Sequence, residues 1–295
     1  MIKNQRKLSV SAAVPLGNRD WQSALMIISI CLLSSAASVN AQGNWFATGY
    51  LQYSQGDYIF GSNTATFYLV PGLRYEARGW NFSAILPVVS QNNNLVTQVG
   101  GILVPHGGSS NMGGMGNSGA MSTTGSMSNI VGLGDLFLSG EYQIVHPDFD
   151  QTQAGSPTLG VDIQVKVPTA STAHNFGTGK FDFGSSINYR QMFGTFVVMA
   201  NAGYIVLGKP AGVEFNNPFT YGGGVGKFFN NEDFSVALMY QGYTAVLSGY
   251  PPPDQASLGL NYKVSSGVIG AVVFSKGLTN TALSFGVTGG FRWSL

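Results

Sequence analysis

The most constraining feature of this sequence is the alternation of its last residues, 282–295. The odd positions of this segment carry Leu283, Phe285, Val287, Gly289, Phe291, Trp293 and Leu295. The even positions carry Ala282, Ser284, Gly286, Thr288, Gly290, Arg292 and Ser294. A helix would instead repeat its apolar residues every three or four positions. The period of two predicts a β-strand that has one apolar and one polar or small face.

The same period recurs along most of the chain. In 157–168, the residues Leu159, Val161, Ile163, Val165 and Val167 alternate with Gly160, Asp162, Gln164 and Lys166. Similar alternation occurs in 136–144, 180–190 and 256–264. We predict about twelve strands, near 44–55, 64–77, 79–88, 132–145, 157–168, 180–192, 195–208, 217–229, 233–246, 255–264, 267–276 and 281–295. Their lengths suit tilted membrane crossings, and an even number is the rule for single-chain bacterial barrels.

The N-terminus has the pattern of a secretory signal peptide. The basic residues Lys3, Arg6, Lys7 and Arg19 precede the apolar run Ala24–Leu33. Small residues follow, and Val39-Asn40-Ala41 is a possible cleavage site. The run is too short to span a bilayer, which takes about 20 residues. We therefore predict a signal peptide over 1–41 and an exported domain over 42–295.

Composition narrows the function classes. Only 9% of the residues are charged, against about 25% in soluble domains, and glycine supplies 41 of 295 residues. The 14 Lys+Arg and 13 Asp+Glu form no basic patch, which argues against a nucleic-acid partner. No stretch after the leader has 18 uninterrupted apolar residues. An exported, charge-poor chain of alternating strands predicts a transmembrane antiparallel β-barrel in the outer membrane of a Gram-negative bacterium.

The connections between the predicted strands support this topology. Short turns at 78–79, 193–194, 230–231 and 265–266 alternate with longer connections, and 90–130 is predicted as a long extracellular loop rich in Gly, Ser and Met. The connection at 146–156 is an exception, because it should be a short turn like these four but is longer. Trp45, Trp80 and Trp293 then fall at periplasmic strand ends, where an aromatic girdle is expected. A soluble β-sandwich would bury such tryptophans in mid-strand.

Three glycine-rich motifs resemble those of a known family. The motifs are Val131-Gly132-Leu133-Gly134-Asp135, Lys166-Val167-Pro168-Thr169 and Phe176-Gly177-Thr178-Gly179-Lys180-Phe181-Asp182. In order and spacing through 132–208, with compatible strands onward to 295, they resemble the putative MetA-pathway of phenol degradation family. Ala170 stands where that family has glycine. The resemblance implies an outer-membrane barrel that transports hydrophobic or aromatic compounds, with no catalytic residues. It also implies that the barrel assembly machinery reads the C-terminal strand as its insertion signal.

Charged residues on the inward parity are candidates for lining the lumen. They are Asp135, Glu141, Asp162, Lys166, Lys180, Asp182 and Arg190. Charges removed from water must be paired or hydrated. They either form a salt-bridge network that fills the lumen or set the selectivity of a passage, and the two roles can coexist. Twelve strands should leave a narrow passage, because eight strands are filled by side chains and sixteen leave a channel.

The long loop offers a second candidate site. It contains His106, Met112, Met115, Met121 and Met127, and thioethers are soft ligands that suit Cu(I). Their spacing is irregular, so the alternative is a flexible extracellular loop without metal. Such a loop could also fold inward as a partial plug.

The function predicted from these features is passive uptake of small, hydrophobic or aromatic compounds. The partners are outer-membrane lipid, the barrel assembly machinery and the solute, with no cofactor. His106, His146 and His174 lie on separate loops, so their spacing supports no Ser/His/Asp arrangement and we predict no enzyme. The alternatives are a structural or adhesive barrel and a barrel enzyme that acts on lipid.

Overall fold

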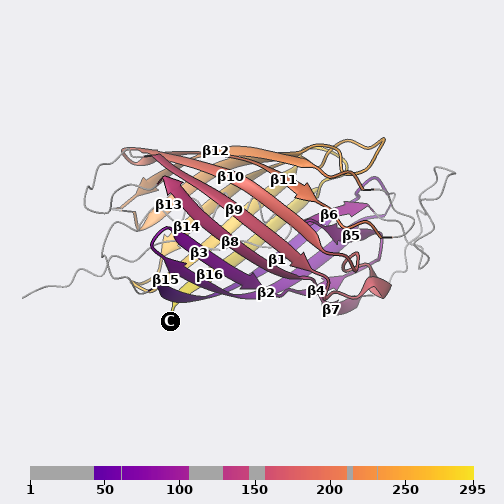
Figure 1. The fold of residues 1–295 in the computed structure, drawn as a ribbon. Helices are drawn as coiled ribbons and strands as arrows, with labels where there is room; N and C mark the ends of the chain where they lie inside the picture. Colours follow the sequence, from indigo (N-terminus) through magenta and orange to yellow (C-terminus); the bar gives the residue numbers. More distant parts are fainter. Residues whose placement is uncertain (1–42, 61, 106–128, 146–156, 211–214, 231) are drawn as a thin grey trace, which may run out of the picture.

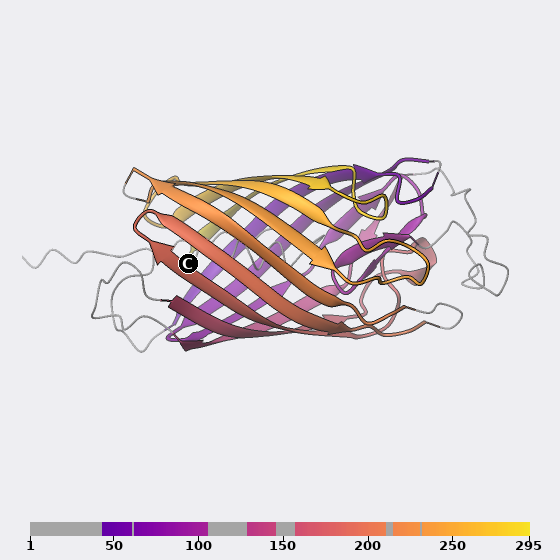
Figure 2. The same cartoon turned by 90° about the horizontal axis from the view of Figure 1, so that it is seen from above.

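The described residues, 43–60, 62–105, 129–145, 157–210, 215–230 and 232–295 of the computed structural model, form a closed antiparallel β-barrel (Figures 1 and 2). The predicted signal peptide lies outside these residues. The strands are β1 Asn44–Gly56, β2 Thr64–Ala77, β3 Trp80–Ile85, β4 Val88–Gln91, β5 Val96–Val99, β6 Ile102–Pro105, β7 Ile130–Leu133, β8 Leu136–Val145, β9 Pro157–Val167, β10 Asp182–Phe193, β11 Phe196–Val206, β12 Phe219–Phe229, β13 Phe234–Tyr243, β14 Gln255–Lys263, β15 Val268–Gly277 and β16 Phe285–Ser294. One short 3-10 helix, η3 (Thr172–His174), lies between β9 and β10.

The barrel closes because β1 pairs with β2 on one side and with β16 on the other. Two wall strands are interrupted. β3 and β4 follow one another beside β2, and β7 and β8 follow one another on their other side. β5 and β6 pair only with each other. The wall therefore has twelve strands, as the alternation predicted.

The two interruptions lie side by side for a physical reason. β3 ends before Leu86-Pro87, and proline has no N–H to donate to a ladder. β8 begins after Gly134-Asp135, and the Gly134 N–H donates to the Pro87 carbonyl oxygen at 2.8 Å. A Cβ on Gly134 would lie 2.7 Å from the Pro87 ring, so only glycine fits there. Asp135 lies in the gap between β7 and β8, outside both strands, and its side chain is fully buried.

Short and long connections alternate around the barrel as predicted. The turns at 78–79, 194–195, 230–233 and 264–267 are short, and the connection 146–156 at the same end is the longer exception. The opposite end carries longer connections and the β5–β6 hairpin (Figure 1). Both chain ends of the barrel meet at the short-turn end, where the Leu295 N–H donates to the Trp45 carbonyl oxygen at 2.9 Å. In bacterial barrels the short turns are periplasmic and the long loops extracellular.

The alternation of side chains also follows the prediction along the strands. On β9, the even positions from Thr158 to Lys166 are buried and the odd positions are partly or fully exposed. Leu283 is an exception. It lies in the connection before β16, is only 7% exposed and packs inward, because β16 begins at Phe285 rather than at 281.

The outer face is apolar on every side, with exposed residues such as Leu51 on β1, Ile163 on β9 and Val225 on β12. No helix in the part of the chain that the structure describes is long and apolar enough to cross a membrane. A closed antiparallel barrel satisfies its own backbone hydrogen bonds, so its strands can face lipid. A closed barrel with an apolar outer face is the architecture of transmembrane β-barrels.

Candidate solute pathway

Five of the seven predicted lumen charges are buried on the inward face, namely Asp135, Glu141, Asp162, Lys166 and Asp182. Arg190 is partly buried on the inward parity of β10. Lys180 differs from the prediction, because it is exposed in the connection that precedes Asp182, the first residue of β10. Lys180 precedes the strand, so the alternation of β10 does not apply to it and its side chain does not face the lumen.

Lys166 lies between two carboxylates near the extracellular end of the lumen. Its Nζ is 3.0 Å from Asp135 Oδ2 and 2.9 Å from Asp182 Oδ2, and all three side chains are at most 2% exposed. Lys166 also donates to Thr178 Oγ1 at 3.2 Å. Each carboxylate also accepts a hydrogen bond from the backbone. The Ala170 N–H donates to Asp135 Oδ1, and the Gly208 N–H donates to Asp182 Oδ1. We call Lys166, Asp135 and Asp182 the ion triad; it joins the interruption beside β8 to β9 and β10.

A second set of charges, absent from our sequence predictions, lies near the periplasmic end. Glu76 on β2 is 2.7 Å from Arg74 Nε and 2.9 Å from Arg292 Nη2 on β16. The guanidinium carbon of Arg292 lies 3.4 Å from the ring centroid of Phe46, as in a cation–π contact. The inward parity of Arg292 was visible in the alternation of 282–295. Its pairing with Glu76 depends on barrel closure, which brings residues 216 apart in sequence together.

Charge is confined to one side of the lumen. The buried or partly buried inward charges lie on β16, β2, β8, β9, β10 and the interruption before β8. Among the described residues of β11 to β15, the buried inward side chains are uncharged. Small polar residues such as Ser83 and Ser139, with Oγ atoms 2.6 Å apart, fill space between the charges.

The opposite side of the lumen is uncharged over these described residues and carries many apolar side chains, with buried polar ones such as Thr220, Gln241 and Ser257 among them. Its buried apolar residues belong to one cluster, and we call the part of it on and directly beside the barrel strands the apolar track: Val197, Met199, Ile205 and Leu207 with Phe228, Ala237, Met239, Ile269, Ala271 and Val273. Val197 and Phe228 lie at the periplasmic end, and Leu207 lies at the extracellular end. The loop residues Phe215, Tyr243, Val246 and Leu247 extend the track outward.

The β5–β6 hairpin folds into the extracellular end of the barrel. All eight residues of its two strands are buried, although this segment falls within the loop predicted over 90–130. The hairpin turns at Gly100-Gly101, which have φ of 55° and 89° and so favour glycine. At the turn, the Gly100 N–H donates to Asp182 Oδ2 at 2.8 Å. The sequence left two alternatives for the long loop, a flexible extracellular loop and an inward-folded partial plug. Residues 96–105 fit the second of these.

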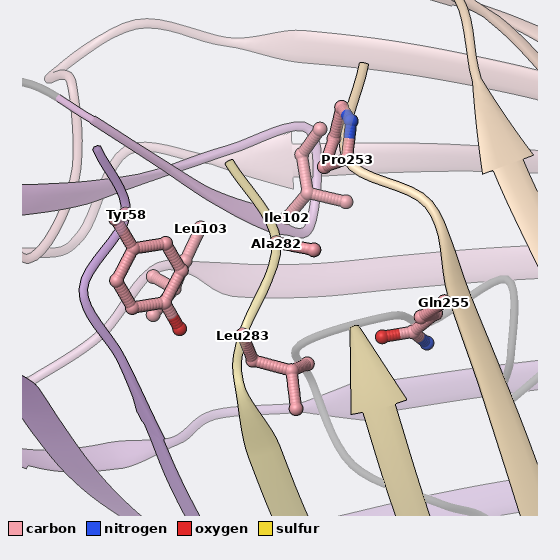
Figure 3. A pocket seen from close by; sticks show the side chains of 7 residues that line it. All are labelled: Tyr58, Ile102, Leu103, Pro253, Gln255, Ala282 and Leu283. Atoms are coloured by element: carbon pink, nitrogen blue, oxygen red, sulfur yellow. The ribbon is translucent and has the colours of Figure 1, made fainter. Parts of the chain in front are cut away.

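A small cleft marks the seam between the hairpin and the barrel wall (Figure 3). It is lined by Ile102 and Leu103 of the hairpin and by Tyr58, Pro253, Gln255, Ala282 and Leu283 of the surrounding chain. Its volume is about 20 Å³, room for about one water molecule. The hairpin therefore packs closely against the wall along this seam.

Residues 94–295 match the sequence profile of the family described as Putative MetA-pathway of phenol degradation. The chain belongs to this family. The glycine-rich motifs had predicted this membership. The family match begins at Asn94 and so includes the hairpin and the ion triad, but not Arg74 and Glu76.

The chain is similar to several solved structures, one of which shares the barrel fold with a TM-score above 0.5. The COG4313 outer membrane channel from Pseudomonas putida F1 is 12% identical, with a TM-score of 0.59 over 88% of this chain and 98% of that chain. The NanC porin is 11% identical, with a TM-score of 0.49 over 84% of this chain and 100% of that one. The KdgM porin is 10% identical, with a TM-score of 0.46 over 84% and 99% of the two chains. No curated protein sequence matches the chain.

The predicted girdle tryptophans lie together at the short-turn end of this family member. Trp45, Trp80 and Trp293 are each about half exposed on the outer face. Trp45 contacts Tyr75 with ring centroids 5.0 Å apart, and Trp80 contacts Tyr142 at 4.4 Å. Contact with the membrane interface remains a prediction that fits this placement.

The predicted metal site is not part of the described structure. His106, Met112, Met115, Met121 and Met127 all lie outside the described residues. Within the described ranges, no group of three or more His, Cys, Asp or Glu side chains is arranged to hold a metal ion.

Proposed function

We propose that this barrel is a passive channel for small apolar or aromatic solutes, which move along the apolar track. The observation that carries the proposal is that one cluster of buried apolar side chains includes Leu207 and Phe215 at the extracellular end and Val197 and Phe228 at the periplasmic end. An apolar solute gains about 25 cal/mol for each Å² of its surface removed from water. Apolar side chains at both ends of the lumen therefore favour such a solute over a charged one.

The charged side of the lumen supports the same proposal. Lys166 pairs with two carboxylates, and Glu76 pairs with Arg74 and Arg292, so each set contains charges of both signs. Charges that pair with one another exert a weaker field on a passing ion than an unpaired ring of one sign would. We propose that these residues hold the wall strands together and leave selection of the solute to the track.

The test measures transport in vesicles whose outer leaflet is lipopolysaccharide, because this leaflet slows direct entry of apolar compounds. We expect N-phenyl-1-naphthylamine to enter faster with the protein than without it, and arabinose to show little protein-dependent swelling. Met199→Asn and Met239→Asn place amides in the middle of the track and should slow naphthylamine entry.

Ser186→Asn is the matched control, because Ser186 is buried on the inward face of β10 and is not part of the track. It should leave the rate unchanged. No protein-dependent entry of either solute would favour the structural or adhesive alternative. Release of fatty acid from the vesicles would favour the lipid enzyme.

A further inference from the structure

We infer that the β5–β6 hairpin occupies the outer solute site of the apolar track, so that an apolar solute opens the channel by taking the hairpin's place. This inference rests on the proposed function and adds to it a binding site and a form of autoinhibition. The hairpin would then act as an internal competitor for the solute.

The two faces of the hairpin make different contacts. Val99, Ile102 and Val104 belong to the same buried cluster as the apolar track. Val96 and Leu103 point the other way and belong to a separate cluster with Tyr58, Phe60, Leu95 and Leu283. One face therefore occupies the track, and the other is covered by the loops that follow β1 and β15.

The site under the first face is lined on the barrel side by apolar and aromatic residues. Its lining is Ile205, Leu207, Phe215, Tyr243, Val246 and Leu247, each at most 6% exposed. Leu207 and Ile205 come within 2.9 and 3.1 Å of the position that a Cβ on Gly100 would occupy, so the turn lies directly against them. Three aliphatic side chains of the hairpin fill this space. A neutral solute with an aliphatic or aromatic body is the ligand class that can replace them.

Release of the turn leaves no buried charge without a partner. The Gly100 N–H donates to Asp182 Oδ2, but Asp182 also keeps its ion pair with Lys166 and accepts the Gly208 N–H. At its base the hairpin is held by the connection between β9 and β10, where the Asn175 side-chain amide donates to the Asn94 carbonyl oxygen at 2.8 Å. The turn can therefore leave the wall while the base stays attached.

The first experiment measures ion conductance through single channels in planar bilayers, with 1-naphthol as the probe. We expect the open probability of the wild type to rise with 1-naphthol and to approach that of a variant lacking residues 95–105. The matched compound is 1-naphthalenesulfonate, which has the same rings and a fixed charge and should not open the channel. Block or no change with 1-naphthol, or equal opening by both compounds, would overturn the inference.

A second experiment follows the hairpin itself. Cys31 is the chain's one cysteine, so Cys31→Ala together with Leu103→Cys gives a single thiol on the hairpin face turned away from the track. Leu103 is only 6% exposed, so its thiol should react slowly with a methanethiosulfonate reagent and severalfold faster when 1-naphthol is present. An unchanged rate would contradict displacement of the hairpin.

The channel proposal and the competition can fail separately. If the variant without the hairpin conducts ions but admits no N-phenyl-1-naphthylamine, the proposed function fails. If that variant admits the naphthylamine while 1-naphthol leaves the wild-type hairpin in place, only the competition fails. Should the deletion prevent insertion, Ile102→Ser replaces it, because this change weakens the packing of the hairpin against the track and should lower the 1-naphthol concentration needed for opening.

Discussion

The Gly100 backbone N–H lies 2.8 Å from Asp182 Oδ2, although the two residues are 82 positions apart. Through this hydrogen bond the turn of an inward-folded hairpin contacts a carboxylate of the barrel wall, and that carboxylate also pairs with Lys166 at 2.9 Å. The ion triad that joins the wall strands thus also holds the hairpin in place.

Lys166→Met should destabilise the barrel and leave its ion preference unchanged. The change leaves Asp135 and Asp182 buried without their cation, which costs about 3–5 kcal/mol where desolvation is complete and less in a wet lumen. We expect a lower temperature of heat-induced mobility shift on gels. The control is Lys263→Met, whose exposed pair with Asp233 at 3.6 Å should contribute about 0–1 kcal/mol.

The reversal potential in a salt gradient separates support of the wall from selectivity for Lys166→Met. If the ion triad only supports the wall, the variant and the wild type should give the same value. A shifted reversal potential would show that Lys166 acts on the permeating ion.

Gly100→Ala should increase the ion conductance of the unliganded channel. Its φ of 55° costs an L-residue about 1–2 kcal/mol, and the new Cβ would meet Leu207 at 2.9 Å. Both effects weaken the closed hairpin, which single-channel recording should show as a higher open probability. Gly194→Ala is the matched control. Its φ is 60° and its Cβ would meet nothing within 4 Å, so it should strain a periplasmic turn without opening the channel.

Deletion of residues 291–295 should prevent stable insertion into the outer membrane. The lost segment pairs with β1 from Gly49↔Phe291 to Phe46↔Ser294, so the barrel could not close at its periplasmic end. The resemblance also predicts that the assembly machinery reads this segment. Membrane fractionation and heat modifiability measure the outcome, with Trp293→Phe as a control that keeps the aromatic alternation. Normal insertion of the truncated chain would contradict a barrel closed by this strand.

Cysteines at the two ends of the barrel should label from opposite sides. In a chain carrying Cys31→Ala, a cysteine replacing exposed Pro251 should react with a membrane-impermeant maleimide on intact cells. A cysteine replacing exposed Ser265 should react only after the outer membrane is permeabilised. The reverse pattern would invert the assigned orientation.

The number of wall strands and the faces of their residues followed from sequence alone. A strand that separates lipid from a lumen must alternate its side chains, so the parity of 157–168 and 282–295 gave the inward positions of Asp162, Lys166 and Arg292. The short turns then gave the order of the strands around the barrel. Both are local properties, readable from neighbouring residues.

The partners of those inward residues were decided only by the tertiary structure. Parity says that a side chain faces the lumen, but the stagger and closure of the barrel determine what it meets there, as for Arg292 with Glu76. The hairpin was hidden for a related reason. Val96–Pro105 is a short apolar segment inside a low-complexity loop, and only the enclosed apolar track provides a surface that makes its burial favourable.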